Sequence, residues 1–176
     1  ILIETVGVGQ SETMVHSMVD FFLLLMLSGA GDELQGIKRG IMEMADAIII
    51  NKADGDNIQS AKNAKMQYSS ALHLFPPTNS GWIPKVETCS SLHKENVSEI
   101  WNIMDKFKEW MQERNLIQHK RKEQAKYWFH QSIENSLLDQ FYNDRNNANA
   151  VKGLEEKVME GHLTPHKAVQ LLLSKN

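Results

Sequence analysis

An apolar run, Ile48–Ile50, leads directly into the tetrapeptide Asn51–Asp54, which reads NKAD. A carboxylate has two acceptor oxygens, so Asp54 can accept a bidentate pair of hydrogen bonds from the ring N1–H and the exocyclic amino group of a guanine base. The amide of Asn51 can brace the loop and approach the opposite edge of the base, while the aliphatic stem of Lys52 lies along its face. These residue types are also common in turns, so the tetrapeptide alone leaves an ordinary surface turn open.

The elements that must position this tetrapeptide alternate between strands and helices. Apolar runs predict strands at Ile1–Ile3, Phe21–Leu27, Ala47–Ile50 and Ile83–Cys89. Helical spacing predicts helices over about Ser11–Val19, Ile37–Ala45 and Ile58–Leu74. Such alternation over short loops predicts an α/β fold with a parallel sheet. The Phe21–Leu27 run lacks polar alternation, which is typical of a central strand covered on both faces.

Ligands of parallel sheets bind at the carboxyl ends of the strands. The loops after Ile3, Leu27 and Ile50 are all expected at that edge. The sequence therefore predicts a ligand site where these loops meet, with the tetrapeptide as one of its walls.

From Val97 onward the pattern is helical throughout. One predicted helix carries the apolar stripe Val97, Ile100, Trp101, Met104, Phe107 and Met111. A longer helix is predicted from Ile117 to Phe141, and its expected buried residues are Ala125, Trp128, Phe129, Ile133, Leu137 and Phe141. Two shorter helices follow, the last with Thr164 as N-cap and Pro165 at the first helical position. We interpret the long helix as an arm that contacts another subunit, with packing on the sheet as the alternative.

Two parts are predicted from this change of pattern: residues 1–114 as the α/β domain and residues 115–176 as an all-helical extension that mediates dimerisation. The chain has 176 residues, a formal net charge of −3 and one cysteine, Cys89. Charges of both signs are interspersed, so neither a nucleic-acid partner nor an anionic membrane is indicated. The most apolar run, Phe21–Leu27, is far shorter than the roughly 20 residues of a membrane-spanning helix. A single cysteine excludes an internal disulfide and suits a reducing compartment.

Three runs together carry a resemblance to a known family. They are Glu4–Glu12 (ETVGVGQSE), Gly31–Gly40 (GDELQGIKRG) and Asn51–Asp54. They closely resemble the MeaB/ArgK family of P-loop GTPases, metallochaperones that attend the cobalamin-dependent methylmalonyl-CoA mutase. The resemblance covers nearly the whole chain and implies a parallel-sheet G domain followed by a helical extension. It also implies GTP or GDP as ligand, Mg²⁺ as cofactor, an acyl-CoA mutase as partner and a homodimer.

The resemblance assigns roles to residues before and after the first helix of the sheet domain. Glu4–Gly7 looks like the switch II motif, with Glu4 near Mg²⁺ directly or through a water molecule, and with the Gly7 amide on the γ-phosphate. Such an amide contact is lost when the phosphate leaves, which is how a switch senses hydrolysis. Ordinary turn glycines are the alternative for Gly7 and Gly9.

A third switch loop is implied by the Gly31–Gly40 run. Its matching residues are Asp32, Glu33, Gln35 and Lys38. Lys38 could neutralise phosphate charge or stabilise a transition state. The alternative is a solvated helix start, in which acidic residues are favoured by the helix dipole.

A guanine-contact loop is implied by Ser90, Ser91 and Leu92, whose amides would meet the base O6. Ser91 replaces the alanine of the family pattern. The glycines that the family carries around Lys94–Asn96 are absent, which leaves the conformation of this loop open.

The glycine-rich phosphate loop and the first switch of such GTPases do not occur among these 176 residues. We expect both upstream of Ile1, in a longer protein of which this chain is the C-terminal part. The chain alone is then expected to bind GTP weakly and to hydrolyse it negligibly.

The resemblance therefore implies a GTPase that gates cobalamin loading or protection of an acyl-CoA mutase, in the cytoplasm or, in a eukaryote, the mitochondrial matrix. Two alternatives remain open from the residues. One is a non-catalytic interaction or dimerisation module, and the other is an ATPase or kinase associated with amino-acid transport. The pair Asn51 and Asp54 argues against the second, because adenine presents no matching pair of donors.

Overall fold

The computed structural model describes residues 1–5, 11–28, 39–76, 78 and 80–174. The described chain divides into two compact units, Ile1–Gln124 and Ala125–Asn176. The predictions for Gly7 and Gly9 and for the third switch loop lie outside the described residues. The domain boundary predicted after residue 114 stays a prediction.

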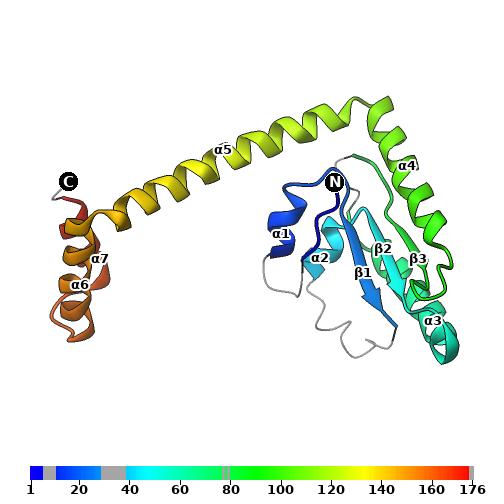
Figure 1. Cartoon of the computed structure of the whole chain (residues 1–176), viewed down its shortest axis with the longest axis horizontal. Helices are drawn as coiled ribbons and strands as arrows, with labels where there is room; N and C mark the ends of the chain where they lie inside the picture. Colours follow the sequence, from blue (N-terminus) through cyan, green and yellow to red (C-terminus); the bar gives the residue numbers. More distant parts are fainter. Residues whose placement is uncertain (6–10, 29–38, 77, 79, 175–176) are drawn as a thin grey trace. The chain divides into compact units, whose positions relative to one another are not determined.

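The first unit is built on a three-stranded sheet (Figure 1). Its strands are β1 (Leu23–Leu27), β2 (Ala47–Asn51) and β3 (Lys85–Thr88), in the order β1-β2-β3. Both pairs are parallel, with Leu27 opposite Asn51 and Ile50 opposite Thr88. The predicted α/β fold with a parallel sheet is confirmed. Because the three strands end together, the chain leaves all of them at one edge of the sheet.

Two strand predictions are wrong. Ile1–Ile3 belongs to no strand, and its side chains are exposed. Three residues offer too few ladder hydrogen bonds to hold an extended segment without a neighbouring strand. In the sheet formed by the described residues, β1 lies at the edge rather than at the centre, and Leu25 and Leu27 are 60% and 50% exposed. The central strand is β2, where Ala47–Ile50 are wholly buried because helices cover both faces of the sheet at this strand.

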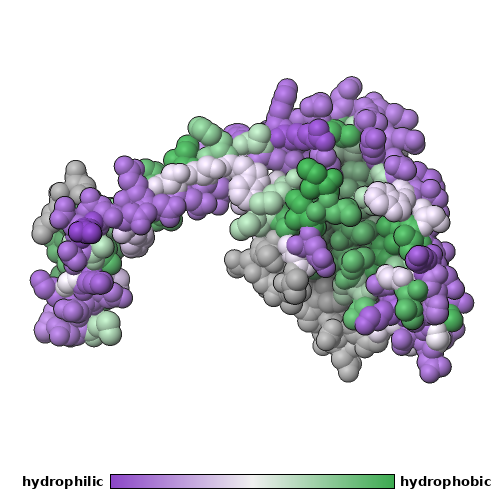
Figure 2. All heavy atoms as spheres, viewed as in Figure 1, coloured by the Kyte–Doolittle hydropathy of each residue, from purple (hydrophilic) through white to green (hydrophobic). Residues whose placement is uncertain are grey.

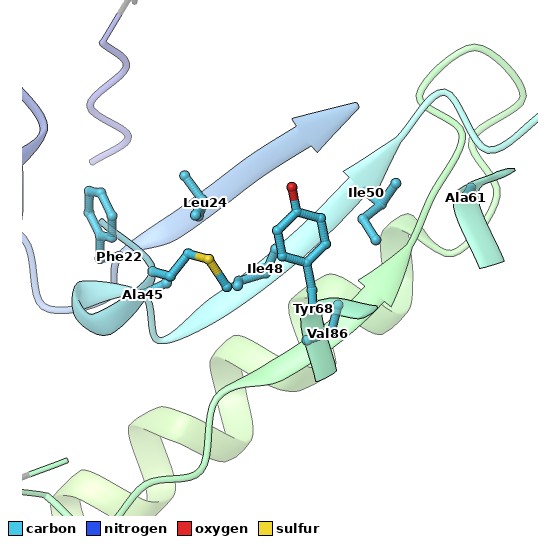
Figure 3. Packing of buried hydrophobic residues seen from close by; sticks show 9 residues of the cluster. Phe22, Leu24, Ala45, Ile48, Ile50, Ala61, Tyr68 and Val86 are labelled. Carbon is cyan, nitrogen blue, oxygen red and sulfur yellow. The ribbon is translucent and has the colours of Figure 1, made fainter. Parts of the chain in front are cut away.

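One face of the sheet is covered by α1 (Ser11–His16), α2 (Arg39–Met44) and α3 (Ile58–Leu72). Figure 3 shows the core on this face, where Tyr68 of α3 lies over the sheet residues Ile48 and Val86. Alternate residues of parallel strands point to one face, so Leu24, Ile48 and Val86 enter the same cluster. The alternating pattern thus fixes α3 against β2 and β3.

The other face is covered by α4 (Val97–Glu113), with Trp82 between helix and sheet. The stripe predicted for this helix is partly wrong. Phe107 and Met111 are buried as expected, but Ile103 is buried in place of Trp101, which is 53% exposed. The aromatic contacts of Phe107 with Phe21 and Trp82 rotate the helix so that the Ile103 side faces the sheet.

The long helix α5 (Leu116–Asn143) begins in the first unit and continues into the second. It is followed by α6 (Arg145–Met159) and α7 (Pro165–Leu173), which pack on each other. The predicted cap of α7 is present, since the Thr164 hydroxyl accepts a hydrogen bond from the Lys167 N–H at 3.3 Å. None of the helices in the described part of the chain combines the length and apolar composition of a bilayer-spanning segment.

The burial predicted for the second half of α5 is wrong. The helix has no fully buried residue, and Phe129, Ile133 and Leu137 are 63%, 41% and 60% exposed. Figure 2 shows hydrophobic side chains along the middle of α5, flanked by hydrophilic ones. The remaining predicted residues are half-buried or exposed: Ala125, Trp128 and Phe141. Apolar spacing predicts which face of a helix favours burial. Whether that face is buried depends on whether the same chain supplies a surface that packs against it.

Candidate functional site

The tetrapeptide leaves the sheet at the carboxyl end of β2. Asn51 is the last residue of that strand, and Lys52 turns the chain with a positive φ of 58°. Asp54 then precedes the short 3₁₀ helix η2 (Gly55–Asn57) as its N-cap. Its carboxylate makes no capping hydrogen bond to that helix. The side chain is therefore committed elsewhere.

The carboxylate of Asp54 is held by the loop after β3. The Ser90 hydroxyl donates a hydrogen bond to Asp54 Oδ2 and accepts one from the His93 N–H at 3.1 Å. Ser90 is only 1% exposed, so its hydroxyl is a fixed donor rather than a freely rotating surface group. Among the described residues nothing donates to Asp54 Oδ1. The carboxylate is oriented through one oxygen while the other stays open to a ligand.

Asn51 braces the same loop from the neighbouring strand. Its Oδ1 accepts hydrogen bonds from the Lys52 N–H at 2.7 Å, the Ser91 N–H at 3.1 Å and the Ser91 hydroxyl at 3.0 Å. The Cys89 thiol lies 3.4 Å from the same oxygen as a further donor. Burial raises the pKa of Cys89, so the thiol keeps the proton that it donates. All these contacts use the amide oxygen, which leaves the amide N–H groups of Asn51 to donate to a ligand.

Backbone hydrogen bonds fix the two loops to each other. Cys89 N donates to Ile50 O at 2.9 Å, and Ala53 N donates to Cys89 O at 3.0 Å. These bonds extend the pairing of β2 and β3 beyond the strand ends. The side chains of Asn51 and Asp54 are thereby placed against residues 89–91.

The loop after Ser90 closes without the glycines of the family pattern. Ser90 and Glu95 exchange backbone hydrogen bonds of 3.2 and 3.0 Å, and Asn96 Nδ2 donates to Thr88 O at 3.2 Å. Lys94 and Asn96 take positive φ angles of 58° and 59°, a left-handed conformation that glycine adopts most readily. Non-glycine residues thus supply the turn, and Asn is among those that tolerate it best.

This donor and acceptor set fits a guanine base. Asp54 presents a fixed carboxylate for the N1–H and amino donors, and Asn51 presents N–H groups for the N7 and O6 acceptors of the opposite edge. Leu92, expected beside the base through its amide, has a side chain that is 77% exposed. Lys52 is exposed at the turn, with its stem available to a ring face.

The other predicted residues are not brought to this site by the described structure. Glu4 is exposed, and no described helix or strand contains it. Gly7, Asp32, Glu33, Gln35 and Lys38 lie outside the described residues. In the part of the chain that the structure describes, no three His, Cys, Asp or Glu side chains gather as metal ligands. The assignments to Mg²⁺ and phosphate stay predictions.

Two contributions were missed by sequence reasoning. Ser90 was assigned a backbone role, yet its hydroxyl holds the Asp54 carboxylate. Cys89 was assigned no role at the site, yet its thiol lies at hydrogen-bond distance from Asn51. The available signal was the position of both residues at the end of the strand beside β2, where parallel pairing brings the following loops together.

The parallel sheet, with this loop pair at its carboxyl edge and helices after it, has the fold of part of a P-loop GTPase. A solved structure titled LAO/AO transport system kinase matches 97% of the chain with a TM-score of 0.77 and 36% sequence identity. The chain belongs to the MeaB family, because the family model described as methylmalonyl Co-A mutase-associated GTPase MeaB matches residues 1–146.

Curated relatives agree with this membership. The chain is 43% identical over 173 residues to the mitochondrial methylmalonic aciduria type A homolog of Mus musculus. The matched region covers 98% of the chain and 42% of that protein. It is 44% identical over 142 residues to the GTPase ArgK of Escherichia coli, covering 81% of the chain and 43% of that protein. The match to the solved structure covers 54% of its chain. The chain therefore spans about half or less of the length of each of these proteins.

Proposed function

We propose that the protein binds and hydrolyses GTP and thereby gates the loading or protection of cobalamin in methylmalonyl-CoA mutase or a related acyl-CoA mutase. The observation that supports this most directly is the carboxylate of Asp54, oriented by the buried Ser90 hydroxyl while Asn51 braces the same loop. The family description names the mutase association. The proposed location is the bacterial cytoplasm or the mitochondrial matrix, in keeping with the names of the relatives.

Guanine, rather than adenine, is the base that this site favours. A carboxylate accepts two hydrogen bonds from the N1–H and amino group of guanine, whereas the corresponding edge of adenine has an unprotonated N1. An ionised carboxylate facing that nitrogen would be left with an unpaired acceptor, which costs free energy. The same reasoning argues against an ATP-dependent role, although the solved relative is titled a kinase.

The phosphate side of the site rests on the family resemblance. Glu4 would hold Mg²⁺ directly or through a water molecule, and the Gly7 amide would contact the γ-phosphate. Asp32, Gln35 and Lys38 would form a switch loop that responds to the nucleotide and communicates with the mutase. Magnesium supplies charge neutralisation at the phosphates in such sites.

Calorimetry on the full-length protein tests the proposal. We expect GDP to bind at least tenfold more tightly than ADP, a difference of about 1.4 kcal/mol. Equal affinities would contradict the guanine assignment.

The rate of GTP hydrolysis, measured with and without the mutase, tests the role of Lys38. Lys38→Ala should leave basal GTP affinity nearly intact and reduce the stimulation, and equal stimulation in both proteins would remove the role of Lys38.

We further propose that the protein is a homodimer that associates through its helical extension. A hollow of about 280 Å³ on α5 is lined by Phe129, Ser132, Ile133, Ser136, Leu137 and Gln140. These positions recur every three or four residues, which places them on one helix face. Phe129, Ile133 and Leu137 form the exposed apolar part of this face, and exposed apolar side chains at such spacing are typical of a helix that packs against another helix.

Sedimentation of the full-length protein tests the dimer. Leu137→Asp should dissociate it, because a charge buried in an apolar helix interface has no partner. Asn135→Ala, at an exposed position of the same helix, is the matched control and should sediment as the wild-type protein does. A dimer that survives Leu137→Asp unchanged would contradict the assigned interface.

A further inference from the structure

Two consecutive serines after β3 connect the two side chains that are proposed to contact the base. The Ser90 hydroxyl donates to the Asp54 carboxylate, and the Ser91 N–H and hydroxyl lie 3.1 and 3.0 Å from Asn51 Oδ1. The backbone of Cys89 is hydrogen-bonded on both sides to the chain of β2 and its following loop. The two serines are therefore held between Asp54 and Asn51.

The two serine hydroxyls differ in how firmly they are committed. Ser90 is 1% exposed, and its hydroxyl both donates to Asp54 and accepts from the His93 N–H. Ser91 is exposed, and its hydroxyl lies beside Asn51 Oδ1 and the Cys89 thiol. A serine hydroxyl turns about its Cβ–Oγ bond to suit its partners. Of the two, the Ser91 hydroxyl is the one that can turn toward a ligand.

Asn51 Oδ1 does not depend on the Ser91 hydroxyl. An amide oxygen has two lone pairs. The backbone N–H groups of Lys52 and Ser91, at 2.7 and 3.1 Å, fill both of them. The Ser91 hydroxyl at 3.0 Å and the Cys89 thiol at 3.4 Å are additional donors to the same oxygen. The hydroxyl proton can therefore leave Asn51 without creating an unpaired acceptor.

The edge of guanine has an acceptor at the matching place. Its polar groups follow the order 2-amino group, N1–H, O6 and N7 around the base. With the first two on Asp54 and N7 toward the N–H groups of Asn51, O6 falls between these side chains, where the two serines lie. A carbonyl oxygen has two lone pairs, so O6 can accept from a hydroxyl as well as from the amide expected at Leu92.

We propose that Ser91 is a base-contacting residue whose hydroxyl donates a hydrogen bond to O6 of guanine. The contact rests on the proposed function, because Asp54 and Asn51 define where the base lies. It assigns the 6-oxo group of the base to the Ser91 side chain and leaves the 2-amino group to Asp54. The two contacts can therefore be tested separately with nucleotides altered at one group or the other.

Calorimetry of the full-length protein with GDP, 6-thio-GDP and IDP tests the contact. The sulfur of 6-thio-GDP is a weak acceptor in place of O6, and IDP lacks the 2-amino group. We expect Ser91→Ala to bind GDP roughly 2- to 12-fold more weakly than the wild-type protein, the range for one neutral hydrogen bond. Its affinity for 6-thio-GDP should fall less, so the preference for GDP over 6-thio-GDP should shrink. The preference for GDP over IDP should not change, because Asp54 is retained.

Two further variants separate the hydroxyl from a general disturbance of the loop. Ser91→Thr keeps a hydroxyl and should keep the preference for GDP over 6-thio-GDP. Ser98→Ala removes an exposed hydroxyl on α4 and should bind all three nucleotides as the wild-type protein does.

The outcomes distinguish the Ser91 contact from the proposed function. A wild-type protein that binds no guanine nucleotide would overturn the proposed function and the contact with it. If the wild-type protein binds GDP and Ser91→Ala keeps its preference over 6-thio-GDP, the contact alone is overturned. A loss of equal size for GDP and 6-thio-GDP belongs to this case, since the hydroxyl would then act only by holding Asn51. An equal fall in the preference over IDP would also overturn the contact, because the variant would then have disturbed Asp54.

Discussion

Replacement of Ser90 by alanine should weaken guanine-nucleotide binding while leaving the fold in place. The substitution removes one oxygen atom from a residue that is 1% exposed. Two hydrogen bonds are lost: the one that the hydroxyl donates to Asp54 and the one that it accepts from the His93 N–H. The backbone exchange between Ser90 and Glu95 does not use the side chain and should remain.

The magnitude follows from the surroundings of the two partners. A hydrogen bond to a charged group contributes about 1.5–3 kcal/mol and a neutral one about 0.5–1.5 kcal/mol. His93 is exposed and Asp54 is half-buried, so water replaces part of both bonds. We therefore expect a loss of about 1–2 kcal/mol in the free energy of unfolding. Fixing a freed Asp54 side chain on binding costs about 0.5–1.5 kcal/mol, roughly 2- to 12-fold in affinity.

Chemical denaturation and GDP calorimetry of the full-length protein measure the two effects separately. Ser98→Ala provides the control, because this serine is exposed on α4 and belongs to no described hydrogen bond. If Ser90→Ala loses stability but binds GDP as tightly as Ser98→Ala does, then Ser90 does not position Asp54 for the base.

Three further predictions concern the elements that hold the site and its extension. Asp46→Ala should lower the free energy of unfolding by about 1–3 kcal/mol, because the Phe22 N–H loses its acceptor. Asp46→Asn keeps a side-chain oxygen that can accept this hydrogen bond. Burial raises the pKa of Asp46, so the folded state binds its proton more tightly than the unfolded state. The Asp46 contribution to stability should therefore fall as pH rises from the unfolded to the folded pKa, and denaturation of Asp46→Asn across that range should lack the fall. Ile48→Ala, at a wholly buried position of β2, should cost about 2–5 kcal/mol in chemical denaturation, and a loss below about 1 kcal/mol would contradict the core. Thr164→Ala removes the acceptor of the Lys167 N–H and should cost α7 about 0.5–2 kcal/mol, seen as faster hydrogen exchange in its first turn; unchanged exchange would show that the cap contributes nothing.

The sheet and the place of the tetrapeptide could be predicted because they follow from local patterns. A continuous apolar run predicts a buried strand, and NKAD directly after it falls at the carboxyl edge where ligands bind. The contact of Ser90 with Asp54 could not be predicted in the same way. It depends on the register of β2 against β3 and on the turns at Lys52 and Lys94, which are set by three-dimensional pairing.

Burial was the least predictable property, because it depends on what lies opposite. Leu25 and Leu27 belong to a strongly apolar run, but within the described residues β1 has a neighbouring strand on one side only, and both leucines are exposed. Phe129 and Leu137 have the spacing of a buried helix face, yet the structure of this chain covers neither. Apolar periodicity identifies a face that favours burial and does not identify the surface that buries it.

Guanine selectivity of Asp54→Asn in the full-length protein tests the central claim most directly. An amide presents one acceptor oxygen where the carboxylate presents two, so the bidentate pair with guanine is disrupted. The variant should lose about 1–3 kcal/mol of preference for GTP over XTP, roughly 5- to 150-fold in relative affinity, and shift toward xanthine. A GTP-over-XTP preference equal to that of the wild-type protein would contradict the assignment of Asp54 to the base.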